Sequence, residues 1–159
     1  MSRRRAASRS LTTASGRGRR FAVVTARFNA DITESLRSAC AATLRAGGVT
    51  GGNLVEVYVP GTFELPWACQ RLARTKKFDA VIALGCVIRG ETPHDRYIAQ
   101  ATAQGLMRVS LDTGVPVLFG VLTPLNLRQA RARSGRGAGN KGAEVARAAL
   151  DVAALPGAV

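Results

Sequence analysis

Short apolar segments alternate with longer amphipathic ones from residue 21 to the C-terminus. Runs of β-branched and other apolar residues predict four strands, over residues 21–26, 54–59, 80–88 and 115–121. Apolar residues that recur every three or four positions predict helices over residues 32–46, 65–74, 92–112, 125–133 and 141–154. Strands that are apolar on both faces and separated by helices are typical of a parallel sheet covered on both sides. The pattern therefore predicts a three-layer α/β/α sandwich.

The segments that follow the first three predicted strands hold the candidate binding and catalytic residues. In a parallel sheet these connections line a crevice at the carboxyl edge, where ligands bind. Each segment combines a helix-start signal with a reactive or stacking side chain: Phe28 and Asn29, Phe63 and Glu64, then Thr92 and His94. Aromatic residues are only 5% of the chain, so two phenylalanines in neighbouring loops indicate a flat ring held by stacking. Core packing is the alternative for either one.

His94 is the only histidine of the chain, and it lies at a predicted strand-to-helix junction. Thr92 suits the N-cap and Pro93 the first helical position, which places His94 in the first turn of the helix. Free backbone N–H groups and the helix dipole favour an anion such as phosphate there, and they disfavour imidazolium. We therefore expect a largely neutral His94 that accepts a proton beside a bound phosphate. An ordinary surface histidine at a capped helix is the alternative.

The glycine-rich segment 137–142, GAGNKG, satisfies the dinucleotide-binding pattern G-x-G-x-x-G. Its context does not fit, because such a loop follows a strand, whereas this segment follows the predicted helix 125–133. A phosphate-binding P-loop does not fit either, since Lys141 is followed by Gly142 and not by serine or threonine. We interpret the segment as a turn between two helices, flanked by Arg133 and Lys141. Both side chains suit a phosphate, with solvated charges as the alternative.

Positive charge is concentrated at the N-terminus. The 159-residue chain has a formal net charge of +13 and 47% hydrophobic residues, and residues 1–20 hold seven arginines and no acid. We expect residues 1–20 to form a disordered Arg- and Ser-rich tail and residues 21–159 to form a single domain. A solvated tail is the favoured interpretation. RNA binding, binding to an acidic surface and an organelle transit peptide are the alternatives.

Several protein classes do not fit the composition. No apolar run approaches the roughly 20 residues of a membrane helix, and no secretion signal is recognisable, so we expect a cytoplasmic protein, or an organellar one if residues 1–20 are a transit peptide. Cys40, Cys69 and Cys86 are widely spaced, and with a single histidine they form no metal-ligand pattern. We expect the three thiols to be buried and to pack as small apolar groups.

Taken together, these segments resemble the lumazine synthase family. The motifs ARFN, VPGTFELP, DAVIALGCVIRGETPH, TGVPVLFGVLT and AGNKGAE occur in the order and approximate spacing of that family, from residue 21 to about residue 155. The resemblance implies a flavodoxin-like α/β/α sandwich with a four-stranded parallel sheet. It also implies a transferase that condenses 5-amino-6-(D-ribitylamino)uracil with 3,4-dihydroxy-2-butanone 4-phosphate. The products are 6,7-dimethyl-8-ribityllumazine, phosphate and water, at the penultimate step of riboflavin biosynthesis.

The resemblance implies no metal and no organic cofactor, so the enzyme mainly orients its small-molecule substrates and transfers protons. It assigns the aminouracil and ribityl side of the site to Phe28, Asn29, Phe63, Glu64, Val87, Ile88, Phe119 and Lys141. Within that set, Phe28 would stack on the pyrimidine and Asn29 would help to shape the loop. The phosphate side is assigned to Glu91, Thr92 and Arg133, and proton transfer to His94. Because a carboxylate repels phosphate, we expect the Glu91 side chain to turn outward.

The resemblance also implies an assembly. Family members form homopentamers, and many form icosahedral shells of 60 subunits, with Phe119, Arg133 and Lys141 reaching the site from the neighbouring subunit. The arginine-rich tail lies where family members add an edge strand to a neighbour, and its repeated charge makes that addition unfavourable. We therefore expect assembly to stop at the pentamer or to depend on salt.

Two departures from the family pattern stand out. After His94 the family usually has an aromatic residue and then an acid, whereas this chain has Asp95 and Arg96. The acid is thereby moved about 100° around the helix axis. The second departure is Arg136–Gly137, where a residue such as threonine is commonly followed by lysine. A basic RNA-binding or scaffold protein on the same fold is the competing interpretation of the chain.

Overall fold

The computed structural model describes residues 14–137 and 139–157. Its strands are β1 (Phe21–Ala26), β2 (Leu54–Val59), β3 (Ala80–Cys86) and β4 (Val117–Leu122). Its α-helices are α1 (Ala30–Ala46), α2 (Leu65–Arg74), α3 (His94–Thr113), α4 (Leu127–Ser134) and α5 (Lys141–Ala153), and short 3₁₀ helices cover Gly51–Asn53 and Thr62–Glu64. Every predicted strand and helix is present, with ends that differ by at most two residues.

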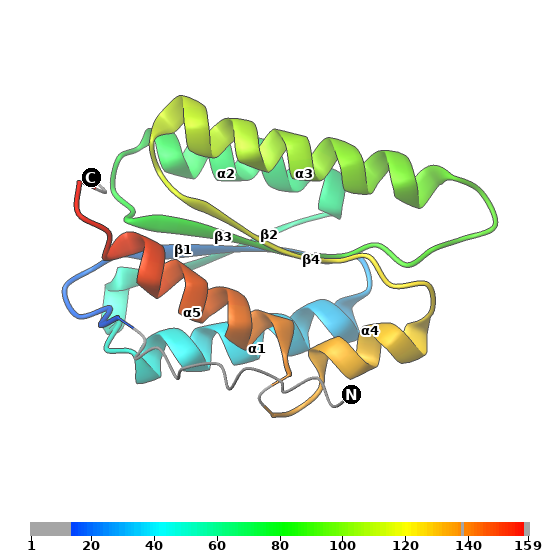
Figure 1. Ribbon diagram of the computed structural model, residues 1–159, viewed down its shortest axis with the longest axis horizontal. Coiled ribbons are helices and arrows are strands. Elements are labelled where there is room, and N and C mark those ends of the chain that lie inside the picture. The colour runs from blue at the N-terminus through cyan, green and yellow to red at the C-terminus, as the bar shows by residue number, and fades with distance from the viewer. Residues whose placement is uncertain (1–13, 138, 158–159) are drawn as a thin grey trace, which may run out of the picture.

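The four strands form one parallel sheet in the order β2-β1-β3-β4. Helices α2 and α3 cover one face of the sheet and α1, α4 and α5 the other (Figure 1). The predicted three-layer sandwich with a four-stranded parallel sheet is confirmed. Because β1 lies between β2 and β3 in the sheet, the chain first adds β2 along one edge of β1 and later adds β3 along the other edge. Such a point opens a crevice at the carboxyl edge of the sheet.

Two buried clusters, one on each face of the sheet, explain why the strand sequences are almost continuously apolar. In β1, Phe21 and Val23 join the cluster under α1 and α5, while Ala22 and Val24 join the cluster under α2 and α3. All six residues of β1 are buried. Successive side chains of a strand point to opposite faces, so a strand covered on both sides needs apolar residues at every position.

Helices α1 and α5 cross at a very short distance because the chain has a glycine at the contact. A Cβ atom at Gly142 would overlap the backbone carbonyl of Leu36. Asn140 caps α5 next to this contact, with its Oδ1 accepting from the backbone N–H of Gly142 at 2.7 Å. The same side chain donates to the carbonyl of Ser134 at 2.9 Å, which connects the end of α4 to the start of α5. The glycine-rich segment is thus a turn between helices, as predicted.

The structure describes residues 14–20 of the predicted tail, and their backbone groups bond to the domain. The backbone N–H of Gly16 donates to the carbonyl of Gly47 at 2.7 Å, and that of Ala14 donates to Asp151 Oδ1 at 3.0 Å. The backbone N–H of Arg20 donates to Asp79 Oδ2 at 2.8 Å. Residues 14–20 therefore pack against the ends of α1 and α5 and continue into β1. The rest of the predicted tail, residues 1–13, lies outside the described residues.

Candidate active site

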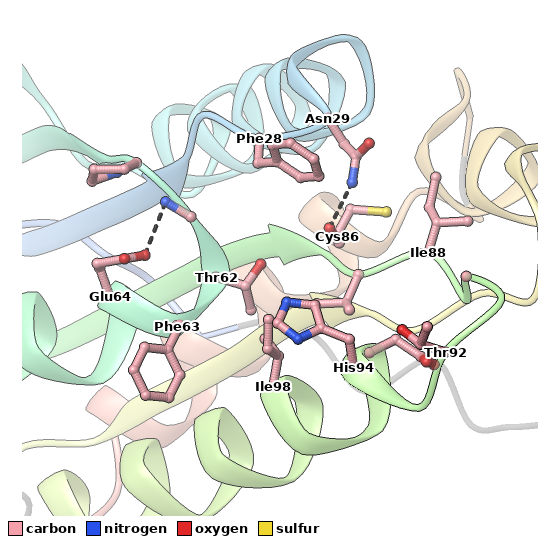
Figure 2. A pocket seen from close by; sticks show the side chains of 15 residues that line it. Phe28, Asn29, Thr62, Phe63, Glu64, Cys86, Ile88, Thr92, His94 and Ile98 are labelled. Atoms are coloured by element: carbon pink, nitrogen blue, oxygen red, sulfur yellow. Dashed lines mark hydrogen bonds between the residues drawn. The ribbon is translucent and has the colours of Figure 1, made fainter.

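A hollow of about 530 Å³ opens at the carboxyl ends of β1, β2 and β3. Three connections and the first turns of α3 line it: Phe28, Asn29, Pro60, Gly61, Thr62, Phe63, Glu64, Cys86, Val87, Ile88, Gly90, Thr92, His94, Asp95 and Ile98. The hollow lies at the crevice that the strand order creates. The three segments singled out in the sequence therefore meet at one place (Figure 2).

The β1–α1 connection carries Phe28, whose side chain is 72% exposed at the hollow. The backbone N–H groups of Arg27 and Phe28 donate to the carbonyls of Val59 at 2.9 Å and Pro60 at 3.1 Å. These bonds continue the β1–β2 ladder beyond the strands and hold the connection beside the next loop. A large flat ring that is fixed through its backbone and left uncovered is suited to stacking on a planar ligand.

The β2–α2 connection carries Phe63 and Glu64. The Phe63 side chain is 62% exposed at the hollow, and Glu64 Oε2 accepts from the backbone N–H of Gly61 at 3.0 Å. The Glu64 carboxylate thus holds its own turn. Thr62 is buried beside Gly85, where a Cβ atom would lie 2.7 Å from Thr62 Oγ1. Because Gly85 has no side chain, this connection packs directly against β3.

The segment after β3 brings His94 to the hollow. The backbone N–H groups of Val87 and Arg89 donate to the carbonyls of Leu122 at 2.8 Å and Pro124 at 3.0 Å, which holds the segment beside β4. Helix α3 begins at His94, and its N-cap is Pro93, without a side-chain capping bond. The predicted N-cap at Thr92 is wrong, because the helix starts one residue later than the Thr-Pro signal indicates.

The phenylalanine and the histidine lie on opposite sides of the hollow. Figure 2 shows the Phe28 ring above it and the exposed His94 imidazole below, with Thr62 between them and Ile98 under the imidazole. A ligand in the hollow would contact an aromatic ring on one side and a proton-transfer group on the other. Thr92 also lines the hollow, whereas the exposed Glu91 side chain is not among its lining groups.

The remaining predicted site residues lie elsewhere in the chain. Arg133 and Lys141 line a separate hollow of about 450 Å³ beside the end of β4. Lys141 Nζ forms an ion pair with Glu144 at 3.0 Å. Phe119, on β4, is 40% exposed and lines neither hollow. One chain therefore brings seven of the eleven predicted binding residues to the first hollow, together with His94. Glu91 lies on the connection after β3 without lining the hollow, and Phe119, Arg133 and Lys141 lie elsewhere.

The sequence did not single out Asp95, Ile98, Thr62 or Cys86 as residues of the hollow. Ile98 follows His94 by four positions, so helical spacing could have placed it on the same face. Thr62 lies inside the VPGTFELP motif, but its burial depends on Gly85 in a different strand. For Asp95 the only signal was the departure from the family pattern.

The three cysteines are buried, as predicted. Burial raises the pKa of the Cys40 and Cys69 thiols to about 12. Burial, with a smaller effect of the Asp31 carboxylate, raises the pKa of Cys86 to about 11. Cys86 lines the hollow, but a thiol with so high a pKa has very little nucleophilic thiolate near neutral pH. It contributes an apolar wall and a backbone carbonyl.

Within residues 14–137 and 139–157, no group of three or more His, Cys, Asp or Glu side chains is placed to hold a metal ion. No helix of that part of the chain is long and apolar enough to cross a membrane.

The fold and the hollow define an α/β protein that receives a small organic ligand at the carboxyl edge of a parallel sheet, next to a histidine. Residues 18–156 match the family described as 6,7-dimethyl-8-ribityllumazine synthase, so the chain belongs to that family. Among its relatives, the 6,7-dimethyl-8-ribityllumazine synthase of Salinibacter ruber is 50% identical over 138 residues, which cover 87% of this chain and 88% of that protein. The enzyme of the same name from Desulfotalea psychrophila is 47% identical over 138 residues, 87% of this chain and 89% of that protein. The predicted family membership is confirmed.

Proposed function

We propose that this chain condenses 5-amino-6-(D-ribitylamino)uracil with 3,4-dihydroxy-2-butanone 4-phosphate to form 6,7-dimethyl-8-ribityllumazine, with release of phosphate and water. The observation that carries the proposal is the hollow in which Phe28 and His94 lie on opposite sides, in a chain that belongs to the lumazine synthase family. A planar heterocycle and a proton-transfer group are what this reaction must bring together.

The aminouracil side of the hollow binds the nucleophile. Phe28 stacks on the pyrimidine ring, Val87 and Ile88 form the edge of its pocket, and Phe63 lies beside the ribityl chain. Glu64 keeps its turn in place through the bond to Gly61, so the backbone of that turn is presented in a fixed orientation to the ribityl hydroxyls. The binding groups therefore act mainly by orienting the amine toward the ketone.

The chemistry consists of condensation, elimination and ring closure. The 5-amino group attacks the ketone carbonyl and water leaves, which gives an imine. Loss of a proton from the carbon next to the imine and departure of phosphate from the adjacent carbon then give an enol, which tautomerises to a ketone. The ribitylamino nitrogen attacks that carbonyl, and loss of a second water closes the ring. His94 is the group of the hollow suited to take up and return these protons, because a carbon acid and an alcohol both lose protons along this path.

The phosphate requires cations that this hollow does not contain. Its lining, which lies entirely within the described residues, includes the acids Glu64 and Asp95 but no lysine or arginine. Arg133 and Lys141 lie in the separate hollow beside β4. We infer that a second copy supplies these cations together with Phe119, and that Thr92 and the backbone of Glu91 contact the phosphate from the first copy.

Exposed apolar side chains support a homo-oligomer. Trp67 on α2, Tyr97, Met107 and Leu111 on α3, and Phe119 on β4 are between 40% and 75% exposed. Large apolar groups that are exposed together on neighbouring elements mark protein interaction surfaces. We propose a homopentamer, with a 60-subunit shell as the larger assembly that the family resemblance implies.

Light scattering of the full chain and of a chain lacking residues 1–13, at low and high salt, tests the proposed assembly. Identical salt-independent shells would contradict the expected effect of the arginines.

A direct assay tests the activity. The purified protein is mixed with both substrates, and formation of the lumazine is followed by its fluorescence. The expected result is a rate well above that of the uncatalysed condensation, with phosphate released in equal amount. A rate equal to the uncatalysed background, from a protein that is folded and assembled, would reject the proposed function.

One surface favours a second candidate function, the binding of RNA. Arg128, Arg131, Arg133 and Arg136, on α4 and the following turn, are exposed, and within residues 14–137 and 139–157 none of them forms an ion pair. Exposed guanidinium groups without acidic partners suit phosphate oxygens. RNA affinity should then fall steeply with salt.

The test replaces Arg128, Arg131 and Arg136 together by glutamine and measures RNA binding over a range of salt concentrations. Loss of most of the affinity supports a surface on α4, with the same substitution of Arg74, on α2, as the control. Affinity that is unchanged in this variant but lost when residues 1–13 are removed would assign binding to the N-terminal segment instead.

A further inference from the structure

Asn29 has an unusual position at the start of α1. Its backbone is left-handed, with φ 60 and ψ 50, and it is the N-cap residue of the helix. Asparagine at an N-cap usually accepts a hydrogen bond from a backbone N–H of the first turn. Here the side chain makes no capping bond. Its Nδ2 donates instead to the backbone carbonyl of Cys86 at 2.9 Å, across 57 positions of sequence.

This bond joins two different walls of the hollow. Asn29 follows Phe28 directly, and Cys86 is the last residue of β3, immediately before Val87 and Ile88. Figure 2 shows the amide nitrogen of Asn29 directed at the Cys86 carbonyl, with the Phe28 ring on one side and Ile88 on the other. The connections that follow β1 and β3 run to opposite faces of the sheet (Figure 1). Beyond the last ladder pair, Thr25 with Leu84, the side-chain bond therefore links the β1–α1 connection to the end of β3.

The left-handed backbone directs the side chain across the crevice. A non-glycine residue with positive φ is uncommon, and asparagine tolerates this conformation better than most residues. Within the described residues, Lys76 is the other non-glycine residue with positive φ, at φ 58, in the turn between α2 and β3. Asn29 therefore has an uncommon backbone conformation, and its side chain does not cap the helix. The side chain bonds to the carbonyl of Cys86 instead.

We propose that Asn29 is a positioning residue: its side-chain amide sets the separation between the stacking ring of Phe28 and the edge of the pocket formed by Val87 and Ile88. This inference rests on the proposed function, because the spacing it sets is that of the aminouracil pocket. One of the two amide hydrogens of Asn29 is directed at the Cys86 carbonyl, so that hydrogen is not available to the substrate. Asn29 acts on the ligand through Phe28.

Two substitutions separate this role from a merely structural one. N29D keeps the shape and tolerates the left-handed backbone, but it replaces the donor by a carboxylate oxygen that repels the Cys86 carbonyl. N29G also removes the donor, but it relieves the left-handed backbone and recovers part of the stability. We expect both variants to raise the KM for the aminouracil and the Kd for 6,7-dimethyl-8-ribityllumazine about tenfold. We expect kcat to change less than about threefold, because His94 is not displaced.

K76G is the matched control, since it makes the same backbone change at the amino edge of the sheet, away from the hollow. It should leave KM and Kd unchanged. A role in stability alone predicts that the loss of affinity follows the loss of melting temperature across N29D, N29G and K76G. The proposed role predicts equal losses of affinity in N29D and N29G despite different melting temperatures. Wild-type affinity in N29D, or affinity that simply follows melting temperature, would overturn the inference.

A ligand-free measurement keeps this test independent of the activity. Hydrogen exchange at the backbone amides of Arg27 and Phe28 should be faster in N29D and N29G than in K76G, because the bond that steadies this connection is lost. If the wild-type protein neither binds the lumazine nor forms it, the proposed function fails while the exchange data still test the link. If the wild type is active and exchange in N29D equals that in K76G, the inference alone fails.

Discussion

At the scale of single residues, the hollow combines one imidazole with an acidic neighbour. His94 and Asp95 both line it and are adjacent in the chain. The carboxylate lies in the first turn of α3, where the helix dipole stabilises a negative charge. In the proposed function the aminouracil is held by stacking and backbone contacts, so removal of the imidazole should affect chemistry more than binding.

H94A should therefore lower kcat by roughly a hundredfold or more, which is the usual contribution of a general acid–base group. The Kd for 6,7-dimethyl-8-ribityllumazine should change less than about threefold, because Phe28, Val87 and Ile88 are untouched. Steady-state kinetics and quenching of the lumazine fluorescence measure the two quantities. Comparable losses in kcat and affinity would contradict this separation of roles.

The buried thiols predict a loss of stability at alkaline pH. Burial raises the pKa of Cys40 and Cys69 to about 12, above the usual value of 9.0 that they regain on unfolding. Their contribution is fully present below pH 9 and is lost as the pH rises toward 12, because the unfolded state releases the protons first. Each such thiol lowers the free energy of unfolding by about 1.4 kcal/mol per pH unit in that range.

Urea denaturation at several pH values between 8 and 11, roughly the range in which the unfolded thiols titrate, measures this slope. C40A and C69A should each make the decline shallower, although both lower the stability at pH 8 by removing a buried atom. An unchanged slope in the double variant would show that other groups cause the alkaline loss.

At the scale of elements, α1 and α5 approach each other closely because residue 142 is a glycine and has no side chain. G142A places a methyl group against the backbone carbonyl of Leu36. Because the contacted atoms belong to the backbone, no flexible side chain can move to relieve the clash. We expect a loss of about 3 kcal/mol in the free energy of unfolding, near the upper range for overpacking. G52A is the control, because no atom lies within 4 Å of its added Cβ. Thermal or urea denaturation compares them, and equal stability of the two variants would contradict the contact.

The order and type of the elements could be predicted because each buried strand is apolar on both faces and each helix has an amphipathic period. The ends were less predictable. Asn126 caps α4, with its side chain accepting from Gln129 N at 2.9 Å, so the helix begins at Leu127 and not at residue 125. The Thr-Pro signal misplaced the start of α3, since Pro93 itself became the N-cap.

The site was predictable only as far as local motifs reach. The loops after three strands meet because parallel strands end at one edge, a rule that needs no coordinates. The bond from Asn29 to Cys86 and the burial of Thr62 beside Gly85 depend on which strands are neighbours, so no local pattern indicates them. The packing of residues 14–20 was missed because their composition is that of a solvated segment, while their contacts are made by backbone groups.

At the scale of the whole molecule, His94 and the two cations proposed to bind the phosphate, Arg133 and Lys141, lie in two different hollows of one chain. If two copies together complete each site, then two inactive variants can restore each other. H94A and R133A, produced together, assemble at random. About a quarter of their shared sites then combine an intact His94 with an intact Arg133.

The mixed assembly should therefore recover roughly a quarter of the wild-type activity, while each variant alone is nearly inactive. The matched control combines H94A with the double variant H94A/R133A, in which no site regains a histidine. Activity no greater than the sum of the separate variants, from assemblies of wild-type size, would show that each chain works with its own residues only.

The entry of the chain into β1 has a practical consequence. Ala14 and Gly16 are bonded to the C-terminal ends of α5 and α1, which lie at the amino edge of the sheet (Figure 1). Strand β1 then spans about 20 Å before its carboxyl end reaches the hollow. A reporter or affinity tag genetically joined upstream of Ala14 would thus be attached on the side remote from catalysis. Immobilisation through that end would leave the substrate entrance facing the solution.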